Sequence, residues 1–226
     1  MNNHEFDQFA GHYDKVLCES IPFGLGDDQY LAEYKIVHVK KLVAGRAINH
    51  ILDFGCGAGR SLPYFSKHFP QASLSGFDLS SESLEMARVR NPKATLYADW
   101  ALVTDRRFDL IFAANVFHHI PDGDQLAALE RCKNVLAQHG RMIVFEHNPI
   151  NPVTRWLFER CPFDAHATMI PKWQLMRRAQ SAGLRVVDDG YTLFFPQQLR
   201  VLRRLEPSLR WLPIGAQYFV VLEAKI

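Results

Sequence analysis

The sequence of 226 residues has few cysteines and no long hydrophobic run, and these absences exclude several classes of protein. Its four cysteines are not arranged in C-x-x-C pairs, which favours free thiols in a reducing compartment over a disulfide framework. No apolar stretch is long enough for a membrane span, and the polar amino terminus does not resemble a secretory leader. We therefore expect a cytoplasmic protein without a membrane span.

The chain also lacks a strong charge of either sign, with 26 lysines and arginines against 24 acids and a net charge of +2. So small a positive net charge does not attract the protein as a whole to nucleic acid or to an anionic membrane. We expect a small molecule as partner and no nucleic acid. The length suits a single domain over residues 1–226, as a monomer or a homodimer.

The most informative pattern present is residues 51–59, Ile-Leu-Asp-Phe-Gly-Cys-Gly-Ala-Gly, a buried strand that leads into a glycine-rich turn. Glycines allow left-handed dihedrals, and they let a ligand approach the backbone N–H groups at the start of a helix. A dinucleotide fingerprint requires a small residue at the next position, where this chain has Arg60. The spacing G-x-G-x-G indicates a nucleotide site of another kind.

Helical and strand patterns alternate along the chain, which predicts a mostly parallel sheet with helices on both faces. In such a sheet, ligands bind outside the carboxyl ends of the strands. After the first strand, strands are expected at 72–78, 94–98, 108–113, 140–146, 184–187 and 217–225. Helices are expected at 6–17, 28–45, 121–140, 154–160 and 171–181.

Several features resemble the class I S-adenosylmethionine-dependent methyltransferases over about residues 48–146. They are the G-x-G-x-G turn after Leu-Asp, an acid at Asp78, the pair Asp99-Trp100, and the segment 115–120 after the fourth strand. The resemblance implies an α/β fold with a doubly wound, seven-stranded, mostly parallel sheet, Rossmann-like, whose last strand is antiparallel and inserted between neighbours. It divides the chain into a helical lid (1–45), a cofactor-binding core (46–146) and substrate-side segments with the last two strands (147–226).

The resemblance also implies that S-adenosyl-L-methionine is the cofactor. Asp78 is about 19 residues beyond the last glycine, near the offset at which a carboxylate meets ribose hydroxyls. Asp99 would lie near the adenine amino group and Trp100 against the ring, while Tyr13 in the lid would close over the cofactor. The expected cofactor-binding residues are Tyr13, Asp53, Gly55, Cys56, Gly57, Gly59, Asp78, Leu79, Asp99, Trp100 and Asn115.

Methyl transfer from a sulfonium requires chiefly a nucleophile held in line with the methyl group. A hydroxyl acceptor also requires a base, and histidine has a suitable pKa. The catalytic candidates are His118 and His119 after the fourth strand and His147 after the fifth. Resembling natural-product and quinone methyltransferases have a histidine facing the acceptor at the end of the fourth strand. The aromatic and arginine-rich segments 148–170 and 191–215 are expected to line a partly apolar, partly anionic acceptor site.

No metal is expected at the places where one branch of the superfamily binds a divalent ion, because Asn115, Glu146 and Asn148 offer only one carboxylate. The Asn-Pro-Pro-Tyr signature of base methylation is also missing, since Val116-Phe117 follows Asn115. The sequence therefore favours methyl transfer to a small-molecule hydroxyl oxygen. Nitrogen or carbon acceptors, RNA methylation and a non-catalytic cofactor-binding role remain as alternatives.

Overall fold

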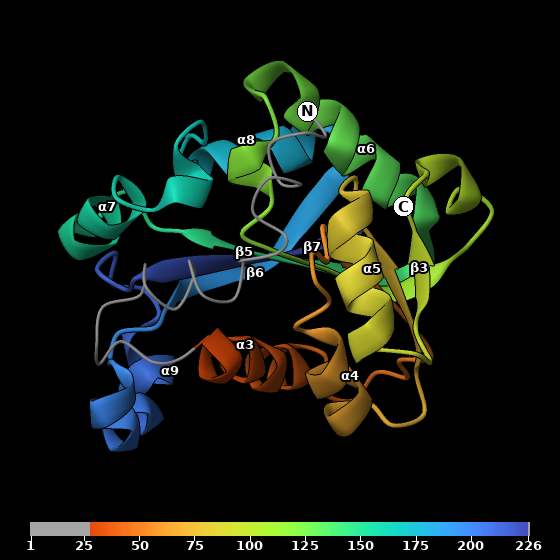
Figure 1. Cartoon of the computed structure of the whole chain (residues 1–226). Coiled ribbons are helices and arrows are strands. Elements are labelled where there is room, and N and C mark those ends of the chain that lie inside the picture. The colour runs from red at the N-terminus through yellow and green to blue at the C-terminus, as the bar shows by residue number, and fades with distance from the viewer. Residues whose placement is uncertain (1–27, 226) are drawn as a thin grey trace.

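The structure is a computed structural model that describes residues 28–225 (Figure 1). The expected lid helix at 6–17, with Tyr13, lies outside the described residues, as does Cys18. In the part of the chain that is described, no helix combines the length and apolar character that a membrane crossing needs.

A seven-stranded sheet with the order β3-β2-β1-β4-β5-β7-β6 forms the centre of the molecule. The first five strands are parallel, and β7 runs antiparallel to both β5 and β6. This confirms the expected fold class, including the last strand inserted between its neighbours. The strands are β1 (His50–Phe54), β2 (Ser73–Phe77), β3 (Thr95–Tyr97), β4 (Phe108–Ala114), β5 (Leu136–His147), β6 (Leu184–Thr192) and β7 (Gln217–Ala224).

Two strands are longer than the sequence predicts. β5 begins at Leu136 instead of residue 140, because Leu136 already pairs with Phe108 of β4. The preceding helix α6 (Gln125–Val135) therefore ends before Gly140. β6 continues to Thr192 because β7 pairs with it along its whole length, and this partner keeps the polar residues 188–190 in the strand. Long-range pairing decides both boundaries.

Helices cover both faces of the sheet: α3 (Asp28–Leu42) and α4 (Leu62–His68) lie below it in Figure 1, and α6 and α8 (Lys172–Ser181) lie above it. α5 (Ser81–Arg90) packs beside β3. Ile36 and Val39 of α3 are fully buried against the lower face, in a cluster that includes Phe65 and Phe145. Residues 28–42, which the sequence analysis assigned to a lid, thus form part of the core layer instead.

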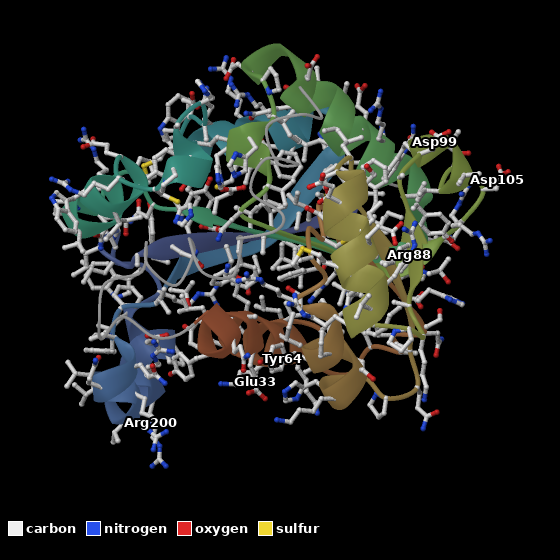
Figure 2. The ribbon with its side chains drawn as sticks, viewed as in Figure 1. Glu33, Tyr64, Arg88, Asp99, Asp105 and Arg200 are labelled. Carbon is white, nitrogen blue, oxygen red and sulfur yellow. The ribbon has the colours of Figure 1, made fainter. Side chains whose placement is uncertain are left out.

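The segments after β5 and β6 gather at one edge of the sheet. α7 (Pro152–Phe158) follows β5, and η6 (Gln197–Leu205) and α9 (Glu206–Leu209) follow β6. β5 and β6 run in the same direction because each is antiparallel to β7, so both segments leave from carboxyl ends. On η6, Arg200 points away from the body of the protein (Figure 2). This is the edge where ligands bind in folds of this type.

Leu52 in the central strand β1 provides a test of the core, because its side chain is fully buried. Leu52→Ala should lower the free energy of unfolding by about 2–5 kcal/mol, through lost apolar burial and the cavity left behind. The matched control is Val89→Ala on α5, where Val89 is 86% exposed. Urea unfolding measures both variants, and equal destabilisation would contradict this description of the core.

Candidate active site

The glycine-rich turn at the end of β1 is held open by its backbone. Gly55, Gly57 and Gly59 have φ angles of 73°, 49° and 71°, a region that side chains disfavour. The N–H groups of Gly55 and Cys56 donate to the carbonyl of Phe77 on β2, at 2.8 and 3.0 Å. The turn is thereby tied to the carboxyl end of the neighbouring strand.

The space around each glycine shows which positions exclude a side chain. A Cβ on Gly55 would lie 2.6 Å from both methyl groups of Val116, and one on Gly59 would lie 2.5 Å from Nδ2 of Asn91. A Cβ on Gly57 would have no atom within 4 Å. Gly55 and Gly59 are therefore required by close packing, while Gly57 borders open space that a ligand can enter.

The Asp78 carboxylate lies beside the turn, as expected for the ribose candidate. Its Oδ2 accepts a hydrogen bond of 2.7 Å from the N–H of Gly57, and its Oδ1 accepts one of 2.9 Å from Ser80. Leu79, between Asp78 and Ser80 in the sequence, is 38% exposed. Asp78 thus joins the glycine-rich turn to the start of α5, and the predicted contact with ribose remains a prediction.

Asp99 and Trp100 follow the third strand, β3. Asp99, labelled in Figure 2, directly precedes the short helix η2 (Trp100–Leu102), and Trp100 is the first residue of that helix. Asp99 Oδ1 caps this short helix by accepting 2.9 Å from the N–H of Ala101. The Trp100 ring packs edge-on against Phe54 and Phe77, at centroid distances of 5.7 and 5.0 Å. Both residues lie along the same edge as the turn, where their predicted adenine contacts would be made.

Buried ionisable side chains lie next to the turn. Burial and the nearby Asp78 raise the pKa of Asp53 to about 8, against the opposing effect of Lys35. Lys35 reaches this region from α3, and burial lowers its pKa to about 8 despite the nearby carboxylates of Glu146 and Asp53. Burial also raises the pKa of the Cys56 thiol well above its ordinary value. Cys56 is therefore a packed, protonated thiol and not a nucleophile.

The three candidate histidines converge at the ends of β4 and β5. The ring centroid of His118 lies 4.1 Å from that of His119 and 5.3 Å from that of His147. The Phe158 ring of α7 stands edge-on to His118 and His147, at 5.5 and 5.7 Å. Of the aromatic residues expected around the acceptor, Phe158 is thus in contact with the histidines, whereas Trp156 and Trp211 are 49% and 72% exposed.

Glu146 organises this cluster from the end of β5. Its Oε1 accepts hydrogen bonds from the N–H groups of Val116 and Phe117, at 3.0 and 2.7 Å. Its Oε2 lies 2.6 Å from Nδ1 of His118. Glu146 is 1% exposed, so these contacts replace the water that its charge would otherwise require. The carboxylate orients the His118 ring.

Asp164 is the acid that the sequence analysis missed. It ends η5 (Pro162–Asp164), and its Oδ1 lies 3.3 Å from Nε2 of His118 and 3.5 Å from Nε2 of His119. No spacing in the sequence connects Asp164 with the two histidines. The only signal was its presence in the segment 148–170, which was expected to face the acceptor.

The two carboxylates divide the histidines into charged and neutral groups. Burial favours a neutral His118, but Glu146 and Asp164 outweigh this effect and raise its pKa to about 9. Burial and the charge of His118 lower the pKa of His119 to about 3 and that of His147 to about 4. At neutral pH, His118 therefore carries the proton, while His119 and His147 are neutral.

Asn115 and Asn148 serve the framework of the site. Asn115 has a φ of 58°, and its Oδ1 accepts a 3.2 Å hydrogen bond from Gln217 of β7. Asn148 Nδ2 donates to the carbonyls of Pro213 and Gly215, at 3.0 and 2.8 Å. Asn148 Oδ1, the atom that a metal ion would use, accepts a 3.1 Å hydrogen bond from the N–H of Ile150.

Comparisons with known proteins identify the kind of domain that the chain contains. Residues 51–140 match the family model described as a methyltransferase domain. A trans-aconitate 2-methyltransferase from Acidovorax sp. is 41% identical over 167 residues, covering 70% of this chain and 60% of that protein. A norreticuline-7-O-methyltransferase from Papaver somniferum is 29% identical over 119 residues, covering 53% of this chain and 33% of that protein. The chain thus spans only part of the curated relatives it matches.

The solved CcbJ methyltransferase from Streptomyces caelestis has a TM-score of 0.70 with this structure, at 15% identity and 100% coverage of both chains. At this identity the likeness shows the fold alone. The fold, the matched segment and the glycine-rich turn together define a class I methyltransferase of the S-adenosylmethionine-dependent type. The chain is a member of that family, and S-adenosylmethionine is its cofactor.

Gly55→Ala tests the role of the turn in binding the cofactor. A left-handed conformation costs a residue with a Cβ about 1–2 kcal/mol, and the new Cβ would lie 2.6 Å from Val116. We expect affinity for S-adenosylmethionine to fall by about tenfold or more, since tenfold corresponds to about 1.4 kcal/mol. Calorimetry with the cofactor measures this loss.

The matched control is Gly45→Ala, which follows α3. Gly45 has a φ of 80°, but a Cβ there would have no atom within 4 Å. This variant carries similar backbone strain away from the turn, so its cofactor affinity should match the wild type. Equal losses of affinity in the two variants would show that general destabilisation, and not the turn, is responsible.

Proposed function

We propose that this protein transfers the methyl group of S-adenosylmethionine, by in-line displacement, to a hydroxyl oxygen of a small-molecule acceptor. The observation that carries the proposal is the histidine and carboxylate cluster at the carboxyl ends of β4 and β5. Val116 links this cluster to the cofactor turn, because its side chain packs on Gly55 and its N–H binds Glu146. An acceptor beside the histidines would therefore lie next to the cofactor.

The cofactor supplies an activated methyl group, so the chain has two tasks: to position the acceptor oxygen and to remove its proton. His118 holds its ring between Glu146 and Asp164 and is a positioning residue. His119 and His147 are in the neutral form that can accept a proton. Phe158 offers an apolar wall beside these rings.

The names of the relatives support a small-molecule acceptor. One is named for trans-aconitate, and another is named for O-methylation of norreticuline. From these names we take, as parts of this proposal, that the acceptor is a small molecule and that the methylated atom is oxygen. The free, buried thiols of Cys56 and Cys132 support the expected cytoplasmic location.

The transfer itself can be tested with cofactor that carries an isotope-labelled methyl group. The purified protein should move the label to at least one member of a panel of hydroxylated and carboxylated metabolites, and mass spectrometry should locate it on a hydroxyl oxygen. Label on carboxylate oxygens alone would overturn the assignment to a hydroxyl. Label on nitrogen or carbon would overturn the assignment to oxygen. Label on RNA alone would favour the RNA alternative, and cofactor binding with no labelled product across all panels would favour the non-catalytic role.

Single variants identify the base. His119→Asn and His147→Asn each remove one candidate base. The variant that lacks the true base should have a kcat lowered about 10²–10⁴-fold, with its cofactor affinity unchanged. His139→Asn is the matched control, because His139 is exposed near the start of β5. Steady-state kinetics with the identified acceptor give the comparison. If both variants retain the kcat of the control, the histidines do not act as base.

A further inference from the structure

The contact between His118 and Asp164 requires a positive charge between the two residues. A carboxylate only accepts hydrogen bonds, so the contact with Glu146 makes Nδ1 of His118 the donor. In the neutral ring, Nε2 then directs a lone pair at the Asp164 oxygen 3.3 Å away. Two lone pairs that face each other repel. Either a proton or a metal ion must therefore lie on this side of the ring.

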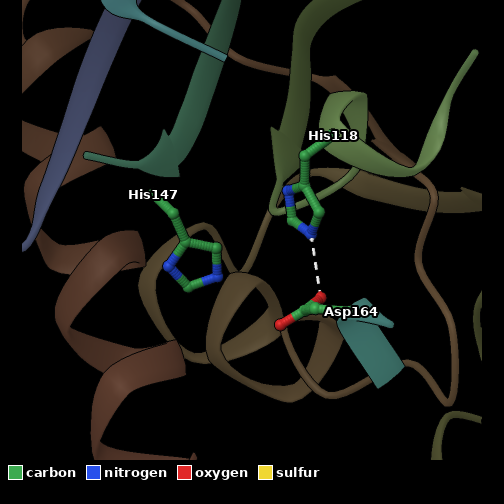
Figure 3. A group of neighbouring side chains, drawn as sticks. All are labelled: His118, His147 and Asp164. Atoms are coloured by element: carbon green, nitrogen blue, oxygen red, sulfur yellow. Dashed lines mark ion pairs between the residues drawn. The ribbon is translucent and has the colours of Figure 1, made fainter. Parts of the chain in front are cut away.

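A third ligand atom faces the same space. The possible metal-binding atoms of His118, His147 and Asp164 all lie within 4.8 Å of one another. Figure 3 shows the rings of His118 and His147 and the carboxylate of Asp164 directed toward a common region from three separate segments of the chain. We propose that His118 Nε2, His147 and Asp164 bind a divalent transition-metal ion, with Zn²⁺ as the best match.

The ligand chemistry supports this choice. Two imidazoles and one carboxylate are ligands that Zn²⁺ uses in catalytic sites, where a fourth position stays open to water or substrate. The set differs from the one dismissed on sequence grounds, which consisted of Asn115, Glu146 and Asn148.

The distances fit a metal site that closes on its ion. Zinc bonds to nitrogen and oxygen measure about 2.0–2.2 Å, so two ligand atoms of a tetrahedral site lie roughly 3.3–3.5 Å apart. The separation of 3.3 Å between His118 and Asp164 matches that value, whereas a charge-assisted N–H···O bond is typically about 2.7–2.9 Å. The widest spacing of 4.8 Å exceeds it. Metal binding would therefore draw the most widely spaced ligand atoms together by up to about 1.5 Å.

Glu146 provides an independent argument. A histidine that binds a metal commonly donates its other ring N–H to a carboxylate, which fixes the tautomer and the ring orientation. Glu146 makes this contact with His118 at 2.6 Å, and the N–H groups of Val116 and Phe117 hold Glu146 itself. The His118 ring is thus oriented to present Nε2 to the other two ligands.

This inference deepens the proposed function and rests on it in one respect, the use of the open metal position. A bound ion there would take the acceptor oxygen as its fourth ligand and lower the pKa of that hydroxyl. His147 would then serve as a ligand, and His119, 3.5 Å from Asp164, would be the neighbouring imidazole that accepts the proton.

Metal binding can be tested without any acceptor. The protein is stripped with a chelator and titrated with Zn²⁺ by calorimetry, and with Co²⁺ by visible absorption, in which a tetrahedral site gives intense bands. We expect about one ion per chain. Asp164→Asn and His147→Asn should each weaken Zn²⁺ binding at least tenfold, and Glu146→Gln should weaken it about 10–100-fold.

His139→Asn is the matched control and should bind Zn²⁺ as the wild type does. Thermal unfolding and S-adenosylmethionine binding show whether each variant is folded. Stoichiometry far below one ion per chain, or folded Asp164 and His147 variants with wild-type affinity, would overturn the metal site. One bound ion with no methylated acceptor would leave the metal site intact and count against the proposed function. Methyl transfer by a protein that binds no ion would overturn the metal site and leave the proposed function intact.

Discussion

The buried carboxylate of Glu146 is the group on which the site depends. It binds the backbone of Val116 and Phe117 directly after β4, and it orients the His118 ring. Val116 in turn packs on Gly55, so the same carboxylate links the histidine cluster to the glycine-rich turn. A buried charge is stable only when its hydrogen bonds are satisfied. Here the hydrogen bonds that satisfy Glu146 fix the end of β5 relative to the residues that follow β4.

The electrostatics around Glu146 explain why one edge of the sheet can carry several roles. Glu146 and Asp164 bring negative charge into a region with little water, and Lys35 and His118 oppose it, while burial raises the pKa of Asp53 to about 8. The positive charge of His118 keeps its neighbours His119 and His147 neutral. Neutral imidazoles can accept a proton or bind a metal ion. The proposed transfer draws on this division of charge, whereas the proposed metal ion would take the place of the proton at His118 Nε2.

Local patterns in the sequence were sufficient to predict the architecture and the glycine-rich turn after β1. The turn over residues 51–59 and the alternation of strands and helices led to the right fold class, because glycine dihedrals and apolar periodicity are local properties. Boundaries that depend on pairing between distant strands were wrong: β5 begins at Leu136 and β6 ends at Thr192. The lid assigned to residues 28–42 was wrong for a similar reason, since only packing shows which face of α3 is buried.

The sequence by itself determined that a glycine-rich turn would follow β1 and that histidines would stand at the ends of β4 and β5. Both follow from residue types next to strands whose direction the alternating pattern already implies. Only the tertiary structure decided that Asp164 would meet His118 and His147, and that Glu146 would orient the His118 ring. These contacts join segments with no fixed spacing along the chain, and their geometry comes from packing and the need to pair buried charges.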